Sequence, residues 1–112
     1  MTVQKELERD LREILKRIVG IADPDRVVLF GSAARGDATP NSDIDLLVVK
    51  EGVAHRGRMT EDIYLSLLGV RRAVDAVVVD SEDLRRYGDA HALILRPALR
   101  EGRVIYERPL RS

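Results

Sequence analysis

Two aspartates and a glycine-serine step stand out in the stretch LFGSAARGDATPNSDIDLLVV, residues 29–49. Asp43 and Asp45 are two residues apart at the start of an apolar run. They would therefore point to the same face of a strand, roughly 6 to 7 Å apart. Gly31 and Ser32 directly follow the preceding apolar run. Carboxylates this close repel each other, and binding of a divalent cation is the usual way in which a protein relieves such repulsion.

A third carboxylate, Asp75, lies in the apolar stretch VDAVVV, where an unpaired charge would be costly. If the runs 44–49 and 74–79 form parallel neighbouring strands, a helical crossover brings their starts together and places Asp75 beside the pair. An all-oxygen ligand set favours Mg²⁺ or Mn²⁺ over zinc. Two such ions, about 3.5 to 4 Å apart, could clamp an in-line displacement at phosphorus.

The glycine-serine step predicts a place for phosphate beside this metal site. Gly31 permits close approach of the backbone, backbone amides that follow it offer donors, and Ser32 adds a hydroxyl. A metal site facing a phosphate site indicates nucleotide chemistry. A glycine-serine step or an Asp-x-Asp pair alone is weak evidence, because each commonly has only a structural role, whereas their joint occurrence with Asp75 is specific.

The elements that must position these residues follow from the hydrophobic pattern. Apolar residues at three- and four-residue intervals predict an amphipathic helix over 3–18 that ends at Gly20, and a second helix from a Thr60 cap to Gly69. Short apolar runs predict strands, polar and Pro-containing segments predict loops, and a further helical region is expected over 81–101. The strands are expected at 27–30, 44–49, 74–79 and 104–106, with a short helix at 32–35 and a loop at 37–42.

The predicted fold is α/β, in the broader sense α+β, with a small mixed sheet flanked by helices. The run 44–49 is apolar at nearly every position, which is typical of a central strand. The strand at 27–30 must run antiparallel to it for the glycine-serine step to reach the two aspartates, and the sheet is mixed if 74–79 runs parallel to it. The 112 residues, of which 45% are hydrophobic, are expected to form one domain, 1–112.

Composition excludes several classes of function. The 19 basic and 19 acidic residues balance, which argues against a surface that holds nucleic acid by its charge. The absence of cysteine excludes disulfides and thiolate metal sites. No apolar run approaches the roughly 20 residues that span a bilayer, and the charged N-terminal stretch lacks the apolar segment of a signal peptide, so no membrane association and a cytoplasmic location are expected.

The spacing of Gly31-Ser32, Asp43, Asp45 and Asp75 resembles the signature of the nucleotidyltransferase superfamily related to DNA polymerase beta. The segments GSAARG, NSDIDLLVV, VDAVVVD and LREGRVIYE are similar, more narrowly, to the minimal nucleotidyltransferases, the antitoxins of two-gene modules with HEPN-domain toxins. The likeness covers residues 26–107.

The resemblance assigns a role to each matching position. Gly31 and Ser32 would hold the triphosphate, Asp43 and Asp45 would bind two Mg²⁺ ions, and Asp75 would complete the metal site and help to deprotonate the acceptor. Arg35 would either lie near the phosphates or brace the loop through a salt bridge. By the same resemblance, the protein would be an enzyme, a protein adenylyltransferase that transfers AMP from ATP to a tyrosine hydroxyl of the HEPN ribonuclease toxin and so silences it.

Two other functions remain open at this stage. The domain could be a binding module that covers the toxin's active site without chemistry, although the intact set of motif residues favours the enzyme. Transfer to a small molecule such as an antibiotic is a further alternative. Outside the motif, the arginines at 71 and 72 are expected to be solvated, the tyrosines at 64, 87 and 106 to serve packing, and the histidines at 55 and 91 to bind no metal.

Overall fold

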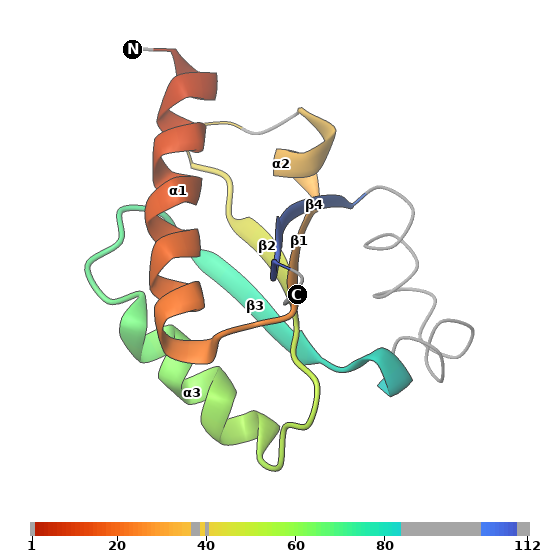
Figure 1. The fold of residues 1–112 in the computed structure, drawn as a ribbon. Coiled ribbons are helices and arrows are strands. Elements are labelled where there is room, and N and C mark those ends of the chain that lie inside the picture. The colour runs from red at the N-terminus through yellow and green to blue at the C-terminus, as the bar shows by residue number, and fades with distance from the viewer. Residues whose placement is uncertain (1, 37–38, 40, 84–101, 110–112) are drawn as a thin grey trace.

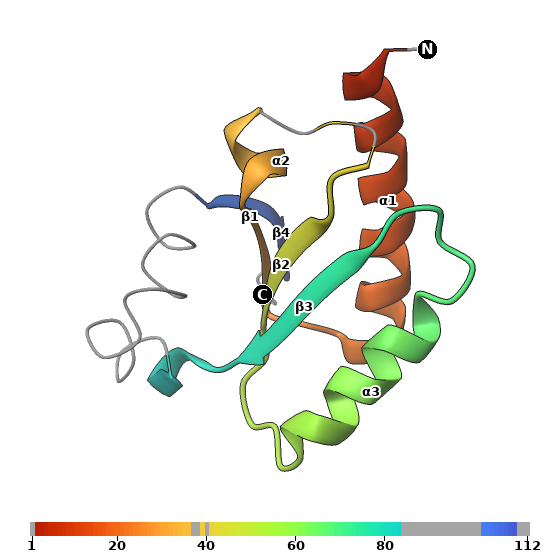
Figure 2. The same ribbon diagram turned by 180° about the vertical axis from the view of Figure 1, so that it is seen from behind.

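The computed structural model describes residues 2–36, 39, 41–83 and 102–109 and shows a four-stranded sheet with two long helices packed on one face (Figures 1 and 2). The strand order is β3-β2-β1-β4. Along the chain the elements are α1 (Val3–Ala22), β1 (Arg26–Phe30), α2 (Ser32–Arg35), β2 (Ile44–Val49), α3 (Arg56–Ser66), β3 (Val74–Val79) and β4 (Arg103–Glu107).

The prediction of a mixed sheet is confirmed. β2 pairs antiparallel with β1 and parallel with β3, and β1 pairs antiparallel with β4. β2 lies between two neighbours, as its nearly continuous apolar sequence indicated, and five of its six residues are buried. β3 lies at one edge of the sheet, with α3 packed against it and against α1.

Side chains of β2 alternate between two apolar clusters, one on each face of the sheet. On the helical face, Leu46 and Val48 pack with Ile14 and Ile18 of α1 and with Ile63 of α3. On the opposite face, the buried residues are Val28, Leu47, Val49 and Val79. Because Asp45 is separated from Leu47 by one residue, its position in the strand belongs to the face opposite α1 and α3.

Three predicted helix boundaries are wrong, one of them the end of α3, which was expected at Gly69 and lies at Ser66. α1 continues past Gly20 to Ala22 because Ala22 is buried one turn after Ile18 and so extends the apolar stripe. Asp23 is the C-cap residue and takes a left-handed conformation with φ 45°. α3 begins at Arg56 instead of Thr60, and the Thr60 hydroxyl donates to the Arg56 carbonyl oxygen inside the helix (2.8 Å).

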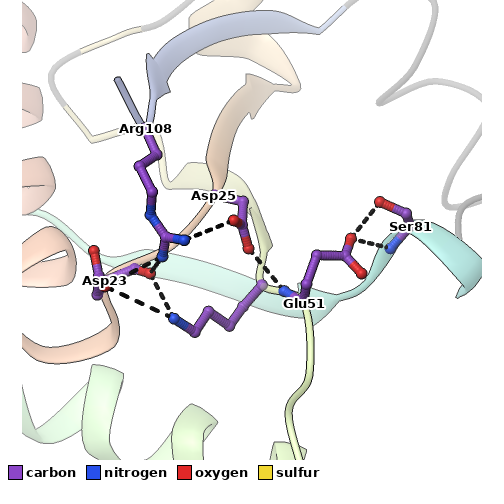
Figure 3. A network of polar contacts seen from close by, with 6 residues as sticks. Asp23, Asp25, Glu51, Ser81 and Arg108 are labelled. Carbon is purple, nitrogen blue, oxygen red and sulfur yellow. Dashed lines mark hydrogen bonds and ion pairs between the residues drawn. The ribbon is translucent and has the colours of Figure 1, made fainter. Parts of the chain in front are cut away.

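One end of the sheet, which we call the far end, carries a network of paired charges (Figure 3). Arg108, just after β4, binds Asp25 through Nη1 (2.9 Å to Oδ1) and also contacts Asp23. The second oxygen of Asp25 accepts the backbone N–H of Glu51 (2.8 Å), and Glu51 in turn accepts hydrogen bonds from the N–H and hydroxyl of Ser81. The network ties the segments that precede β1 and follow β2, β3 and β4.

The region 81–101 was predicted to be helical, and its part beyond residue 83 lies outside the described residues, as do Tyr87 and His91. Within the described part of the chain, no helix has both the length and the apolar character needed to cross a membrane.

Candidate active site

The opposite end of the sheet, which we call the site end, brings together the residues that the sequence singled out. Asp45 is the register partner of Phe30 on β1 and of Asp75 on β3. Phe30 directly precedes Gly31, so the end of β1 and the starts of β2 and β3 meet here. The predicted juxtaposition of Asp45 and Asp75 by parallel pairing is therefore confirmed.

Gly31 touches Asp45 so closely that no other residue fits. Its backbone has φ 73° and ψ −156°, a region essentially restricted to glycine. A Cβ at this position would lie 2.3 Å from Oδ2 of Asp45 and 3.2 Å from its Cγ. Glycine at position 31 therefore allows the carboxylate of Asp45 to lie directly against the backbone.

The electrostatics of the site end are unfavourable to its central carboxylate. Partial burial raises the pKa of Asp45, and the negative charges of Asp75 and Asp43 raise it further. The positive charge of Arg35 acts in the opposite direction but does not outweigh them. Asp43, one residue before β2, is exposed and close enough for its charge to act on Asp45. An excess of negative charge therefore surrounds Asp45.

This donor set fits a divalent cation by its chemistry, since carboxylate oxygens are the preferred ligands of Mg²⁺ and their mutual repulsion disappears when a cation binds. As placed, however, the described residues contain no group of three or more acidic or histidine side chains arranged to hold a metal. One oxygen of Asp75 is engaged elsewhere, with Tyr64. Asp43 and Asp45 are therefore the residues that would hold a cation first.

The other motif residues border the carboxylates from the β1 side. Ser32 is partly exposed and begins α2, a single turn that closes with a hydrogen bond from the N–H of Gly36 to the Ser32 carbonyl oxygen. Arg35, in the same turn, is exposed and lies near enough to Asp45 to lower its pKa. Both residues thus lie next to Gly31, on the side of the site that faces away from β3.

Tyr64 contributes a contact that sequence reasoning missed. Its hydroxyl accepts the backbone N–H of Ala76 (2.9 Å) and donates to Oδ1 of Asp75 (3.3 Å). The tyrosine therefore reaches from α3 around the edge of the sheet and binds β3 beside the carboxylate. The sequence suggested a packing role because Tyr64 follows Ile63 in an apolar helix segment, and nothing in that pattern indicates a partner for its hydroxyl.

Arg72 corrects a second expectation, since it is buried and not solvated. Its Nε binds Oδ2 of Asp10 on α1 (3.0 Å), and its Nη1 donates to the carbonyl oxygens of Thr39 (3.1 Å) and Ser42 (3.3 Å). Ser42 directly precedes Asp43. Arg72 lies just before β3, and it therefore holds the segment that leads into the aspartate motif. No periodicity distinguishes it from its exposed neighbour Arg71.

Comparison with known proteins agrees with this geometry. The sequence model of the nucleotidyltransferase domain family matches residues 8–105. A curated relative from Methanocaldococcus jannaschii, "Putative protein adenylyltransferase MJ0141", is 33% identical over 96 residues, which cover 75% of this chain and 90% of the relative. A second protein of the same organism, "Putative protein adenylyltransferase MJ0604", is 37% identical over 81 residues, covering 72% of this chain and 77% of the relative.

Solved structures with the same fold are more distant in sequence. The crystal structure of a "putative nucleotidyltransferase" from Sulfolobus solfataricus superposes with a TM-score of 0.66 at 23% identity, over 94% of this chain and 84% of the other. A toxin-antitoxin structure with AMP-PNP gives 0.59 at 22% identity, over 87% and 73%.

A third structure extends the comparison to a longer enzyme. The spectinomycin adenyltransferase AAD(9) from Enterococcus faecialis, solved with ATP and spectinomycin, gives a TM-score of 0.63 at 16% identity. The match covers 94% of this chain but 56% of that enzyme. The family match, the curated relatives and the shared fold lead to one conclusion: this chain belongs to the nucleotidyltransferase domain family, as a minimal nucleotidyltransferase with a polymerase beta-like fold.

Proposed function

We propose that this nucleotidyltransferase is a protein adenylyltransferase, which transfers AMP from ATP to a tyrosine hydroxyl of a HEPN-domain ribonuclease toxin. The observation that carries the proposal is the position of Asp45 against Gly31 and beside Asp75, where burial and negative charges outweigh the opposing charge of Arg35. The names of the two Methanocaldococcus relatives support AMP transfer to protein, and the toxin-antitoxin neighbour with AMP-PNP supports a toxin as the partner.

Each motif residue has a chemical task in this reaction. Asp43 and Asp45 would hold two Mg²⁺ ions, or Mn²⁺ in their place. When bound, the ions supply charge stabilisation at the phosphoryl group during in-line displacement. Gly31 and Ser32 would border the triphosphate, with Arg35 close to them.

Asp75 would act on the acceptor. Its carboxylate accepts the proton of the attacking tyrosine hydroxyl, while the bond between the α-phosphorus and the oxygen that bridges to the β-phosphate breaks and pyrophosphate leaves. Its contact with Tyr64 supports this role, because a phenol hydroxyl already donates to Oδ1 of Asp75 (3.3 Å).

The consequence for the toxin follows from charge. An AMP group on a tyrosine near an RNA-binding surface adds bulk and a negative phosphate, which repels the phosphates of the RNA substrate. The toxin would therefore lose its ribonuclease activity through a covalent change.

The test uses the purified protein with the HEPN protein encoded beside its gene, ATP and Mg²⁺. We expect the intact mass of the partner to increase by whole AMP units as its ribonuclease activity disappears. The double variant Asp43→Asn/Asp45→Asn should prevent both changes, whereas Asp25→Asn, which alters a carboxylate at the far end, should prevent neither. Full neutralisation by the double variant without a mass change on either chain would establish a binding module and refute the enzyme.

A further inference from the structure

The site residues lie in a row across three neighbouring strands, and the two ends of this row would face different parts of the reaction. Gly31 follows β1, Asp45 lies at the start of β2, and Asp75 is its register partner on β3. With Gly31 and Ser32 bordering the triphosphate, the leaving pyrophosphate lies at the β1 side of the row. In a displacement at phosphorus the attacking and leaving oxygens are roughly in line, so the acceptor must enter from the β3 side.

β3 is the edge strand, and α3 lies alongside it, so the surface on that side comes from α3 among the described elements (Figure 2). The C-terminal part of α3 and the turn after it expose three large apolar side chains, which we call the outer patch: Tyr64 (39% exposed), Leu65 (63%) and Leu68 (71%). Together with Thr60 and Glu61 they line a groove of about 390 Å³.

Tyr64 makes the outer patch continuous with the site. Tyr64 lines the groove, and its hydroxyl donates to Oδ1 of Asp75 and accepts the N–H of Ala76. A macromolecule that brings a hydroxyl to the exposed Asp75 over the edge formed by β3 and α3 passes Tyr64. Leu65 and Leu68, further along the same groove, are then in position to contact the residues around that hydroxyl.

We propose that the outer patch is the docking surface for the protein acceptor, an inference that rests on the proposed function. The occupant is a folded partner that presents apolar side chains next to its modified tyrosine, which it inserts towards Asp75. Burial of the two exposed leucines would contribute most of the affinity for the partner, because large apolar side chains at the centre of an interface dominate binding. The nucleotide, which binds on the β1 side, gains nothing from the outer patch.

The test compares the double variant Leu65→Glu/Leu68→Glu with the matched control Ile21→Glu. Ile21 is also an exposed apolar residue (51%), but it lies near the end of α1, which leads into the far end. The rate of AMP incorporation is measured by intact mass against the concentration of the HEPN partner. We expect the double variant to raise the KM for the partner about tenfold or more with a nearly native kcat, and Ile21→Glu to change neither.

Further measurements separate the possible failures. The rise in Tm on adding ATP with Mg²⁺ should be the same in the native protein and the double variant, which shows that the variant is folded and binds nucleotide. An unchanged KM for the folded double variant overturns the docking surface and leaves the proposed function intact. Absence of AMP transfer by the native protein overturns both. If sedimentation shows a native dimer that the double variant dissociates, with the KM unchanged, the outer patch joins two copies of this chain instead.

Discussion

The two ends of the sheet treat their carboxylates in opposite ways. At the far end, Asp25 is satisfied by Arg108 and by the N–H of Glu51, and nearby Asp83 has a lowered pKa. At the site end, Asp45 has a raised pKa because burial and the neighbouring charges of Asp75 and Asp43 disfavour its ionised form. The same residue type thus stabilises the fold at one end and opposes folding at the other.

This difference distinguishes carboxylates that stabilise the fold from carboxylates that are candidates for cation binding, and it does so from the structure of this chain alone. Paired charges at the far end join four segments that are distant in sequence, so their removal should cost stability alone. The raised pKa of Asp45 at the site end means that its ionised form is disfavoured by the fold, and binding of a cation would relieve this cost. The comparison would be wrong if a variant at the far end lost activity, or if a variant at the site end lost only stability.

The largest effect should come from Asp45→Asn. It removes a proposed cation ligand, so kcat for AMP transfer should fall by about 10² to 10³ or more. The Tm without metal should stay equal or rise, because a raised folded-state pKa means that ionised Asp45 costs stability at neutral pH. Thermal unfolding with and without Mg²⁺ and ATP checks this, and the ligand-induced rise in Tm should disappear. A clear drop in Tm without metal would show that Asp45 is a structural residue like Asp25.

Gly31→Ala should damage both activity and stability. The new Cβ would lie 2.3 Å from Oδ2 of Asp45, and the backbone at φ 73° and ψ −156° would be strained. We expect a loss of at least about 1 to 3 kcal/mol in unfolding free energy. Transfer activity should fall nearly as far as in Asp45→Asn, since the carboxylate must move. Gly36→Ala is the matched control, because it also has positive φ (83°) but open space around its Cβ position. Equal activity losses in both variants would refute a special contact between Gly31 and Asp45.

Arg72→Ala should disturb the site end through the segment that precedes Asp43. It leaves Asp10 without its buried partner, removes the side-chain donor to the Ser42 carbonyl oxygen, and leaves the Thr39 carbonyl oxygen with the N–H of Ser42 alone. Breaking a buried ion pair from one side costs about 3 to 5 kcal/mol. Arg72→Lys keeps the charge but cannot serve all three acceptors in the same geometry. In Arg72→Lys, kcat should therefore fall clearly while the Tm changes little. Arg71→Lys, at an exposed neighbour, should resemble the native protein in both quantities.

Much of the fold could be predicted because apolar patterning is a local signal. The bounds 44–49 and 74–79 agree with β2 and β3, and the mixed sheet followed from the need to bring Gly31 to Asp45. α1 was misplaced at its end and α3 at both ends, since the pattern cannot show that Gly20 continues a helix or that Thr60 donates inside one. The pairing of Asp45 with Asp75 followed from strand direction alone.

The supporting contacts of the site could not be predicted, because they join residues far apart in sequence through side-chain geometry. Arg72 reaches a segment about thirty positions earlier, and Tyr64 binds β3 across a turn. Neither contact can be recognised from the hydrophobic periodicity of the sequence. The contact between Gly31 and Asp45 was not predicted, and the close approach of a phosphate that the sequence led us to expect at Gly31 stays a prediction.

At the far end, Asp25→Asn should lower stability and spare activity. It removes the charge that Arg108 binds and weakens the acceptor of the Glu51 N–H, at a cost of about 1 to 3 kcal/mol. Urea unfolding measures the loss, and AMP transfer at a temperature well below the Tm should remain native. Loss of transfer in the folded variant would mean that the two ends are coupled and that the comparison is too simple.

The smallest effect concerns acid stability and Asp83. Burial alone would raise the pKa of its carboxyl, but hydrogen bonds from the backbone N–H of Asp80 and from Arg56 (2.6 Å) outweigh burial and lower it. A lowered folded-state pKa contributes stability that is complete above the unfolded pKa and is lost as the pH falls through the folded value, which means below about pH 4. Asp83→Asn should therefore lower the Tm at pH 7 and flatten its decline between about pH 5 and pH 2, because the substituted side chain has no proton to bind. A native-like acid decline in the variant would show that Asp83 is not the source of the acid sensitivity.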